Sequence, residues 1–296
     1  MLSLHFMDKN SPRPLLNWGI FIILSMIWGS SFILMKEGMK SLNAWQVASI
    51  RIFSAGMVLL PVTISKLRSI PQKDLPQIFL SGMLGTFVPA YLFCLAETKL
   101  DSGVAGILNA LTPLFTIVIG AVFFKSKLPV NKWIGVLVGF TGLAMLVSAG
   151  RNVNFSNIGY ASYIIIATIC YGLNVNMVNW YLKHIPSQML ASVAFGLLII
   201  PSGLILLTTG YAAQTGTEGY WYSTGASAVL GIFGTAVASI LFYMLMKRAG
   251  PLFASMVTYG IPFVALFWGS LAGEMITIVQ IACLVLILVG VYLANK

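Results

Sequence analysis

Ten apolar runs alternate with short polar segments along the chain. Each run has about the 20 residues that a helix needs to cross the hydrocarbon core of a bilayer. Because a membrane span must satisfy its own backbone hydrogen bonds, runs of this length predict helices rather than barrel strands. The predicted spans lie at 17–36, 44–65, 76–96, 102–124, 133–149, 157–180, 188–208, 225–246, 252–273 and 276–294.

The composition agrees with a surface that faces lipid. Hydrophobic residues make up 58% of the 296 positions and charged residues only 8%, and the mean hydropathy is +0.93. A soluble domain carries roughly 25% charged residues, so this chain lacks the charge to cover a water-facing surface. The sequence therefore predicts an all-α membrane protein with the lipid bilayer as its main partner.

The basic side chains report orientation. Of the 17 lysines and arginines, only Lys36, Lys40, Lys99 and Arg151 fall on the outer side if the N-terminus is cytoplasmic, and Arg51 lies within a span. Positive residues favour the cytoplasmic side of a membrane, so we expect both termini in the cytoplasm. The net charge of +10 is explained by this bias, and we expect no nucleic-acid partner.

Features of the first half recur in the second half. Pro113 and Pro262 lie 149 positions apart, each in the middle of an apolar run. Further matches at this or a slightly smaller spacing are Gly85-Thr86 with Gly234-Thr235, Phe93 with Phe242, Trp28-Gly29 with Tyr171-Gly172, and Pro61 with Pro201. The matches predict two repeats of five helices, one over residues 1–150 and one over residues 151–296.

Five spans per repeat imply that the second repeat enters the membrane from the opposite face. Inverted repeats suit transporters, in which the substrate site lies near the bilayer midplane between the two halves. A proline in a helix frees one backbone carbonyl and bends the axis, so Pro113 and Pro262 are expected to face the protein interior. The sequence predicts two inverted five-helix repeats around a central cavity.

Several stretches carry a family resemblance. WGSSFILMKEG (28–38) with SIRIFSAGMVLL (49–60), the stretch 100–147 and the stretch 242–274 resemble the EamA family of the drug/metabolite transporter superfamily. The resemblance implies a ten-helix bundle whose cavity is lined by helices one, three and four of each half. It also implies movement of small metabolites, often amino acids and usually outward, across a bacterial inner membrane. A eukaryotic organelle membrane stays open.

The two halves differ at one position of the family pattern. Relatives often carry a glycine-glutamate pair after the fourth span of each half. The second half has this pair as Gly273-Glu274, whereas Lys125 occupies the matching place in the first half. Any role of that acid in the first half is therefore in doubt.

Two aromatic residues head the candidate cavity lining. Trp28 and Ser31 share one helical face of the first span, and Tyr171 and Asn174 share one face of the sixth. Each face offers a large aromatic and a hydrogen-bonding side chain, as a small organic substrate requires. The alternative is that both aromatics only pack in the interior.

Polar side chains beside the two prolines form a second set of candidates. Polar groups at this depth are costly unless they are paired, and the alternatives are a cavity or hydrogen bonds between helices. The residues near the prolines are Asn109, Thr112, Thr258 and Tyr259; weaker candidates on the third and eighth spans are Thr86, Thr235, Tyr91 and Tyr243.

Arg51 is the one charge clearly within a predicted span. It either holds a carboxylate, from a substrate or from a gate residue such as Glu37 or Glu97, or it has a structural role. Long basic side chains near span ends usually extend to the interface, which favours the structural role. Glu97, near the end of the third span, is the nearest candidate for carrying a proton.

The chain lacks the signatures of an enzyme. The two histidines lie in the N-terminal tail and a loop, and no phosphate-binding loop is present, so we expect no catalytic site, metal site or cofactor. A membrane-embedded enzyme and a receptor or scaffold are the alternatives of another class. We expect an alternating-access exporter of small neutral or zwitterionic metabolites such as amino acids, or else a facilitator or exchanger of other metabolites or drugs.

Small residues on the fifth span predict how the chain packs on itself. Gly135, Gly139 and Gly142 leave room for another helix to approach closely. The expected partner is the tenth span of the same chain, so we expect a monomer.

Overall fold

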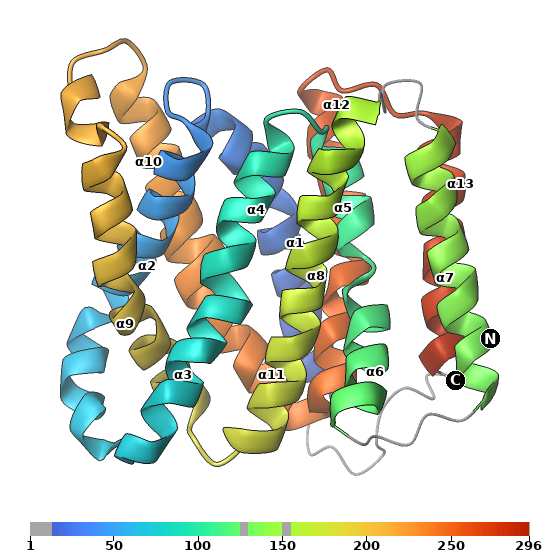
Figure 1. The fold of residues 1–296 in the computed structure, drawn as a ribbon, viewed down its shortest axis with the longest axis horizontal. Coiled ribbons are helices and arrows are strands. Elements are labelled where there is room, and N and C mark those ends of the chain that lie inside the picture. Colours follow the sequence, from blue (N-terminus) through green and yellow to red (C-terminus); the bar gives the residue numbers. More distant parts are fainter. Residues whose placement is uncertain (1–13, 125–129, 150–154, 296) are drawn as a thin grey trace.

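A computed structural model describes residues 14–124, 130–149 and 155–295, and within these ranges every regular element is helical (Figure 1). The first half contains α1 (Pro14–Gly38), α2 (Ala44–Lys66), α3 (Leu75–Gly82), α4 (Val88–Glu97), α5 (Ser102–Asn109), α6 (Thr112–Phe123) and α7 (Val130–Ala149). The second half contains α8 (Phe155–Tyr181), α9 (Ser187–Thr208), α10 (Tyr220–Gly231), α11 (Ala238–Ser255), α12 (Ile261–Leu271) and α13 (Ile278–Asn295).

Every predicted span coincides with helix. Seven helical segments in the described residues are long and apolar enough to cross a membrane, and two shorter apolar helices lie at Trp133–Leu146 and Ile278–Ala294. One of the seven, Tyr220–Leu271, is 52 residues long and is interrupted at Gly250, whose φ of 88° lies in the left-handed region. The chain is an integral membrane protein, and the count of ten spans stays a prediction.

The predicted start of the eighth span at residue 225 is wrong. The helix begins at Tyr220, directly after Gly219, whose φ of 76° ends the preceding loop. Three consecutive aromatic residues, Tyr220, Trp221 and Tyr222, form its first turn. Such residues favour the membrane interface, and their weak hydropathy hid the start of the helix.

The two repeats run in opposite directions. In Figure 1 α1 rises from the lower end of the bundle to the upper end, whereas α8 descends from the upper end to the lower. The α2–α3 and α8–α9 connections lie at the lower end, and the α4–α5, α9–α10 and α12–α13 connections lie at the upper end. This is the inverted arrangement that the odd number of spans per repeat predicts.

Corresponding helices of the two repeats pack against each other. α2 packs along α9, and α7 packs along α13. At the first pair, a β-carbon on Gly56 would meet the carbonyl oxygen of Phe195 at 2.8 Å, and one on Gly196 would meet Thr63 Oγ1 at 2.9 Å. The absence of side chains at matched glycines lets the two backbones approach.

The fifth span packs on the α13 helix, as the sequence predicts. A β-carbon on Gly290 would meet the carbonyl oxygen of Gly135 at 2.8 Å, and one on Gly142 would meet Ile287 Cγ1 at the same distance. Figure 1 shows α7 and α13 side by side at one edge of the bundle. Their contact therefore lies away from the centre of the protein.

Both predicted bends occur where the prolines stand. Pro113 lies in the first turn of α6, after a break at Ala110 and Leu111, and Pro262 lies in the first turn of α12, after a 3₁₀ turn over Met256–Tyr259. Both prolines are buried. Each bent segment therefore sits inside the bundle rather than against lipid.

The third and eighth spans share a feature that the sequence did not predict. Each is interrupted by a π-helical turn, called a wide turn below, over Met83–Phe87 in the first half and over Ile232–Val237 in the second half. The two wide turns start 149 positions apart, at the spacing of the prolines. Such wide turns are frequent at functional sites.

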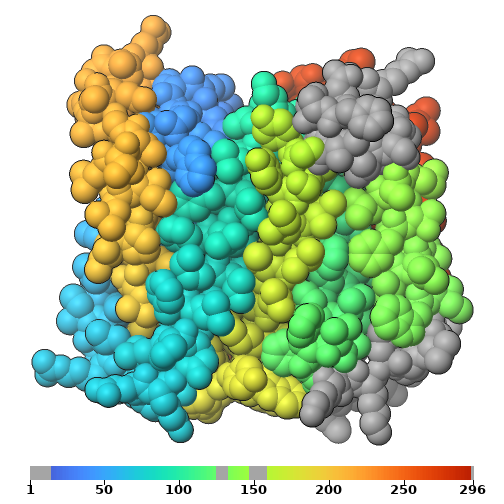
Figure 2. All heavy atoms as spheres, in the orientation of Figure 1, coloured from blue at the N-terminus to red at the C-terminus, as the bar shows by residue number. Residues whose placement is uncertain are grey.

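The outer surface is apolar. Leu207 is 77% exposed and Phe123 is 69% exposed, as expected for side chains that face lipid. In Figure 2 the side chains of α4 and α8 fill the space between these two ribbons at the centre of the view. The cysteines Cys94, Cys170 and Cys283 are all buried and unbonded.

Candidate functional site

A cavity lies between the two repeats. Its lining comes from α1, α2, α4, α5, α6, α8, α11 and α12 and from both wide turns. Its volume is about 90 Å³, well above the roughly 10–15 Å³ that one water molecule needs. The cavity therefore has room for a small solute.

Two aromatic pairs line the cavity. Trp28 packs on Phe242 with ring centroids 5.3 Å apart, and Tyr171 stacks on Phe93 at 6.1 Å. The pairs correspond to each other through the sequence repeat, since Trp28 matches Tyr171 and Phe93 matches Phe242. In each pair, the first helix of one half meets the third span of the other half.

Each wide turn contacts a side chain from the first helix of the other repeat. Trp28 Nε1 donates a hydrogen bond of 3.0 Å to the carbonyl oxygen of Gly234. In the other half Asn174 faces Gly85 and accepts a hydrogen bond of 2.7 Å from Ser81 Oγ, and Ser81 also bonds the Tyr243 hydroxyl at 3.2 Å. Asn174 is therefore anchored across the boundary between the repeats.

The polar residues beside the prolines bond locally. Thr112 Oγ1 donates to the carbonyl oxygen of Asn109 at 2.8 Å, which is the carbonyl that Pro113 leaves without a helical partner. Thr258 Oγ1 donates to the carbonyl oxygen of Ser255 at 2.8 Å. These bonds stabilise the bends, and both Asn109 and Thr258 line the cavity.

Arg51 faces the cavity, and the expectation that it extends to the outer interface is wrong. Its side chain is 8% exposed and lines the cavity from α2. Nε donates to Thr235 Oγ1 at 2.7 Å, and Nη1 lies 3.7 Å from the sulfur of Met35. Among the described residues, no carboxylate oxygen lies within 4.0 Å of its guanidinium.

Glu97 is a buried acid near the upper end of the cavity. Its side chain is 4% exposed, and both carboxyl oxygens lack a hydrogen-bond partner among the described residues. The charges of Lys36, Arg51 and Glu274 reach it. Glu97 does not line the cavity, so its part in the site differs from that of Arg51.

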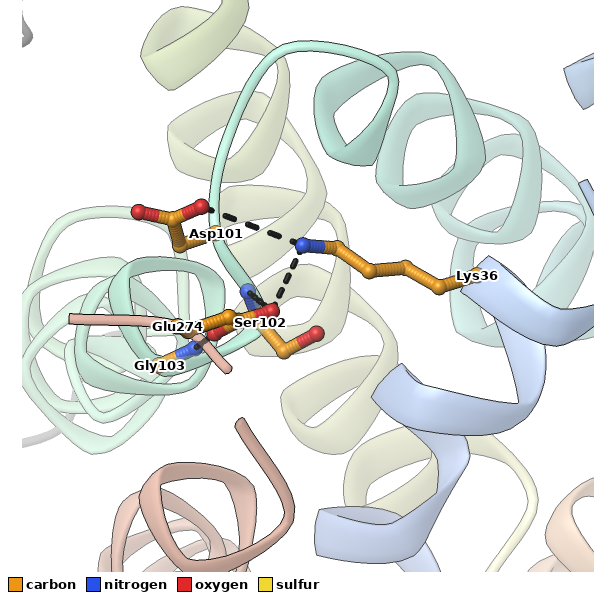
Figure 3. Close-up of polar contacts among 5 residues, drawn as sticks. All are labelled: Lys36, Asp101, Ser102, Gly103 and Glu274. Carbon is orange, nitrogen blue, oxygen red and sulfur yellow. Dashed lines mark hydrogen bonds and ion pairs between the residues drawn. The ribbon is translucent and has the colours of Figure 1, made fainter. Parts of the chain in front are cut away.

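An ion cluster, which we define as Lys36, Asp101 and Glu274, joins the two repeats at the upper end of the bundle (Figure 1 and Figure 3). Lys36 Nζ lies 2.6 Å from Glu274 Oε1 and 3.9 Å from Asp101 Oδ1. Glu274 also accepts hydrogen bonds from the backbone nitrogens of Ser102 at 3.0 Å and Gly103 at 3.2 Å. The cluster joins the end of α1, the start of α5 and the α12–α13 connection.

The pKa values of the two acids of the cluster are shifted in opposite directions. Burial raises the pKa of Glu274, but the hydrogen bonds from Lys36, Ser102 and Gly103 outweigh it and hold that pKa below its usual value. Burial and the nearby charge of Glu274 raise the pKa of Asp101. Glu274 is therefore the firmly ionised member of the cluster.

Lys36 and Glu37 are not merely solvated ends of a span. Lys36 belongs to the cluster, and Glu37 pairs with Lys40 and accepts a hydrogen bond from the Tyr222 hydroxyl at 2.8 Å. Lys125, the first-half counterpart of Glu274, lies outside the described residues.

Ten of the twelve predicted lining residues meet around the cavity; they are Trp28, Ser31, Thr86, Asn109, Thr112, Tyr171, Asn174, Thr235, Tyr243 and Thr258. Tyr91 does not line it, because its hydroxyl bonds Ser49 Oγ at 2.7 Å and its ring packs on Trp45 and Phe87. Tyr259 packs against the core outside the lining. The role of these residues in substrate binding stays a prediction.

Sequence reasoning missed other lining residues. Phe93 and Phe242 were found only as a repeat match, and Ser239 and Ser255 carried no signal. The repeat spacing applied to both aromatic pairs would have found Phe93 and Phe242. Within the described ranges, no cluster of three or more His, Cys, Asp or Glu side chains offers a metal site.

Comparisons with known proteins agree with this geometry. An uncharacterized transporter of Archaeoglobus fulgidus is 26% identical over 94% of this chain and 98% of its own length. The uncharacterized inner membrane transporter YedA of Escherichia coli K12 is 24% identical over 94% and 90%. A solved crystal structure shares the fold with a TM-score of 0.64 at 15% identity, covering 94% of this chain and 96% of its own.

The family comparison covers both repeats. The EamA-like transporter family matches residues 16–148 and again residues 159–296. The two matches divide the chain where the inverted repeats of the structure meet, and together they span nearly its whole length. The chain therefore belongs to the EamA-like transporter family and is a membrane transporter.

Proposed function

We propose that this protein is an alternating-access transporter that moves small neutral or zwitterionic metabolites, such as amino acids, out of the cytoplasm. The observation that carries the proposal is the cavity between the inverted repeats, which is lined by the matched pairs Trp28–Phe242 and Tyr171–Phe93. Inverted halves can exchange conformations, which turns a site open to one side into a site open to the other.

The size and chemistry of the cavity support this substrate class. A cavity of about 90 Å³ favours a small solute. The walls are mostly aromatic and carry hydroxyl and amide groups, with Arg51 as the charged residue among those that line the cavity. A highly charged solute such as a nucleotide sugar would need several cations, which this lining does not offer.

The orientation and setting belong to the same proposal. We place both termini in the cytoplasm of a bacterial inner membrane and assign no catalytic role to the chain. The distribution of Lys and Arg supports this orientation, and the relative YedA is described as an inner membrane transporter. A facilitator or exchanger of other metabolites is the second candidate, because the described lining holds no carboxyl group for carrying a proton.

Reconstitution tests the proposal. Purified protein in liposomes loaded with unlabelled amino acids should accumulate labelled amino acid by saturable counterflow. Trp28→Ala and Asn109→Ala should each reduce this flux about tenfold or more, since they remove a wall and a polar contact of the cavity. Gly225→Ala is the matched control, because a side chain there meets no atom within 4 Å. Unchanged kinetics in both cavity variants would refute the assignment of the site.

A further inference from the structure

We propose that Arg51 binds the carboxylate of the transported solute, so that the cavity selects small solutes that carry a carboxylate group. The inference rests on the proposed function and narrows its substrate class. It makes Arg51 a specificity-determining residue and places the carboxylate end of the solute beside Thr235 and Met35.

The surroundings of Arg51 leave its charge without a direct counter-ion. A buried cation is costly unless it is paired, yet the contacts of Arg51 are the Thr235 hydroxyl and the Met35 sulfur. Among the described residues, Nη2 makes no hydrogen bond or ion pair. A guanidinium presents a rigid fork of donors that matches the two oxygens of a carboxylate. Arg51 is among the residues that line the cavity, so a solute held there can reach this fork.

The second repeat has no cation at the matched position. Gly56 matches Gly196 and Pro61 matches Pro201, both 140 positions apart, and the matched glycines make matched contacts between α2 and α9. At this spacing the counterpart of Arg51 is Ala191, which is fully buried. The same helix packing is thus built with a methyl group in one half and with a guanidinium in the other.

The rest of the cavity suits a solute held at one end by its carboxylate. Asn109 and Tyr171 line the cavity and carry an amide and a hydroxyl as hydrogen-bonding groups. The aromatic faces of Trp28 and Phe242 can hold an ammonium group by cation–π attraction. A zwitterion with its carboxylate on Arg51 would therefore find favourable contacts at both ends.

Glu97 offers the competing explanation. It is the acid of the third span whose charge interacts with Arg51, but no salt bridge within 4.0 Å joins them. If Arg51 served only as a distant counter-ion for Glu97, removal of either charge would have the same effect on transport and leave solute selectivity unchanged. The two explanations therefore differ in a measurable quantity.

The experiment compares amino acids with their carboxamides in liposome counterflow. A carboxamide keeps the size and the ammonium group but lacks the carboxylate. Wild-type protein should prefer each small amino acid over its carboxamide by about tenfold or more, because the carboxamide loses a hydrogen bond between charged groups. Arg51→Gln should bring this preference close to one. Arg51→Lys, which keeps the charge but loses the fork, should keep an intermediate preference.

Arg248→Gln is the matched control. Arg248 also lies in a helix and also donates from Nε to a neutral oxygen, Asn17 Oδ1 at 3.0 Å, but it does not line the cavity. This variant should keep the wild-type preference. Monodisperse elution and the thermal unfolding midpoint establish that each variant is folded.

The outcomes distinguish a failure of the proposed role of Arg51 from a failure of the proposed transport function. Equal flux of acids and carboxamides by the wild type, or a wild-type preference retained in both Arg51→Gln and Glu97→Gln, would overturn the role of Arg51 while transport stands. Absence of flux for every solute of the panel would overturn the proposed function and the inference with it. Loss of preference in Arg51→Gln alone would support both.

Discussion

Gly85 and Asn174 face each other across the boundary between the two repeats. A β-carbon on Gly85 would lie 2.9 Å from Asn174 Cγ. The matched contact in the other half joins Gly234 and Ser31, where a β-carbon on Gly234 would lie 2.9 Å from Ser31 Oγ. Each wide turn thus receives a polar side chain from the first helix of the opposite repeat.

Gly85→Ala should destabilise the protein, because the added methyl group overlaps the Asn174 side chain. Overpacking of this kind costs about 1–3 kcal/mol. The double variant Gly85→Ala with Asn174→Ala should recover part of the lost stability, since the shorter side chain makes room. Thermal unfolding of the four proteins of this cycle measures the coupling. Additive effects of the two substitutions would show that the contact is not direct.

Glu274→Gln should loosen the contact between the repeats at the upper end of the bundle. Glu274 is 11% exposed in its side chain and holds Lys36 and two backbone nitrogens, and loss of hydrogen bonds to a charged group costs roughly 1.5–3 kcal/mol each. Labelling of Met35→Cys by a membrane-impermeant thiol reagent should become faster in the Glu274→Gln background. Native cysteines are buried and give a low background. Equal labelling rates would mean that the cluster does not hold the repeats together at this end.

Acid should weaken the same end of the protein. Because the pKa of Glu274 is held below its usual value in the folded state, its stabilisation is fully present above the unfolded pKa and is lost as the pH falls through the folded pKa. The thermal unfolding midpoint of the wild type should therefore decrease once the pH is lowered below about 4.3, the usual pKa of glutamate.

The Glu274→Gln variant should lack this component of the pH profile. Asp101 acts in the opposite sense, since its pKa is raised and its contribution is present at low pH and lost as the pH rises through the folded pKa. Asp101→Asn is therefore the control: it should steepen the acid loss rather than remove it. Identical profiles for the wild type and Glu274→Gln would contradict the assignment.

Gly290→Val should disrupt the contact between α7 and α13. A β-carbon there meets the Gly139 backbone and the Gly135 carbonyl oxygen, so the two helices would have to separate. The expected cost is about 3 kcal/mol or more, with a loss of monodisperse protein on size exclusion. Gly225→Val, at a helix position with open space, should behave like the wild type.

The hydropathy pattern and the repeat predicted the architecture because both are local or periodic properties of the chain. Pro113 and Pro262 also indicated where the bends lie. The wide turn around Gly234 had no such signal, since its Gly-Thr pair is compatible with an ordinary helix. The structure identifies it by its wide backbone turn, against which Ser31 and Trp28 pack.

Contacts between residues far apart in the chain could not be predicted from the sequence. Lys36 and Glu274 are 238 positions apart, and nothing near either residue indicates the other. The direction of Arg51 depends on Thr235 and Met35, whereas its depth alone favoured the lipid interface. Tyr91 had the right helix for the cavity but the wrong face, which its bond to Ser49 now explains.

The pairing of α2 with α9 and of α7 with α13 has a bearing on how such a chain could arise. Each pair joins corresponding helices of two antiparallel units, so the contacts within this polypeptide are those of a homodimer whose subunits insert in opposite orientations. A single five-helix ancestor with both insertion modes would already possess this assembly. Gene fusion then frees each unit to diverge, as the guanidinium at position 51 opposite the methyl group at position 191 illustrates.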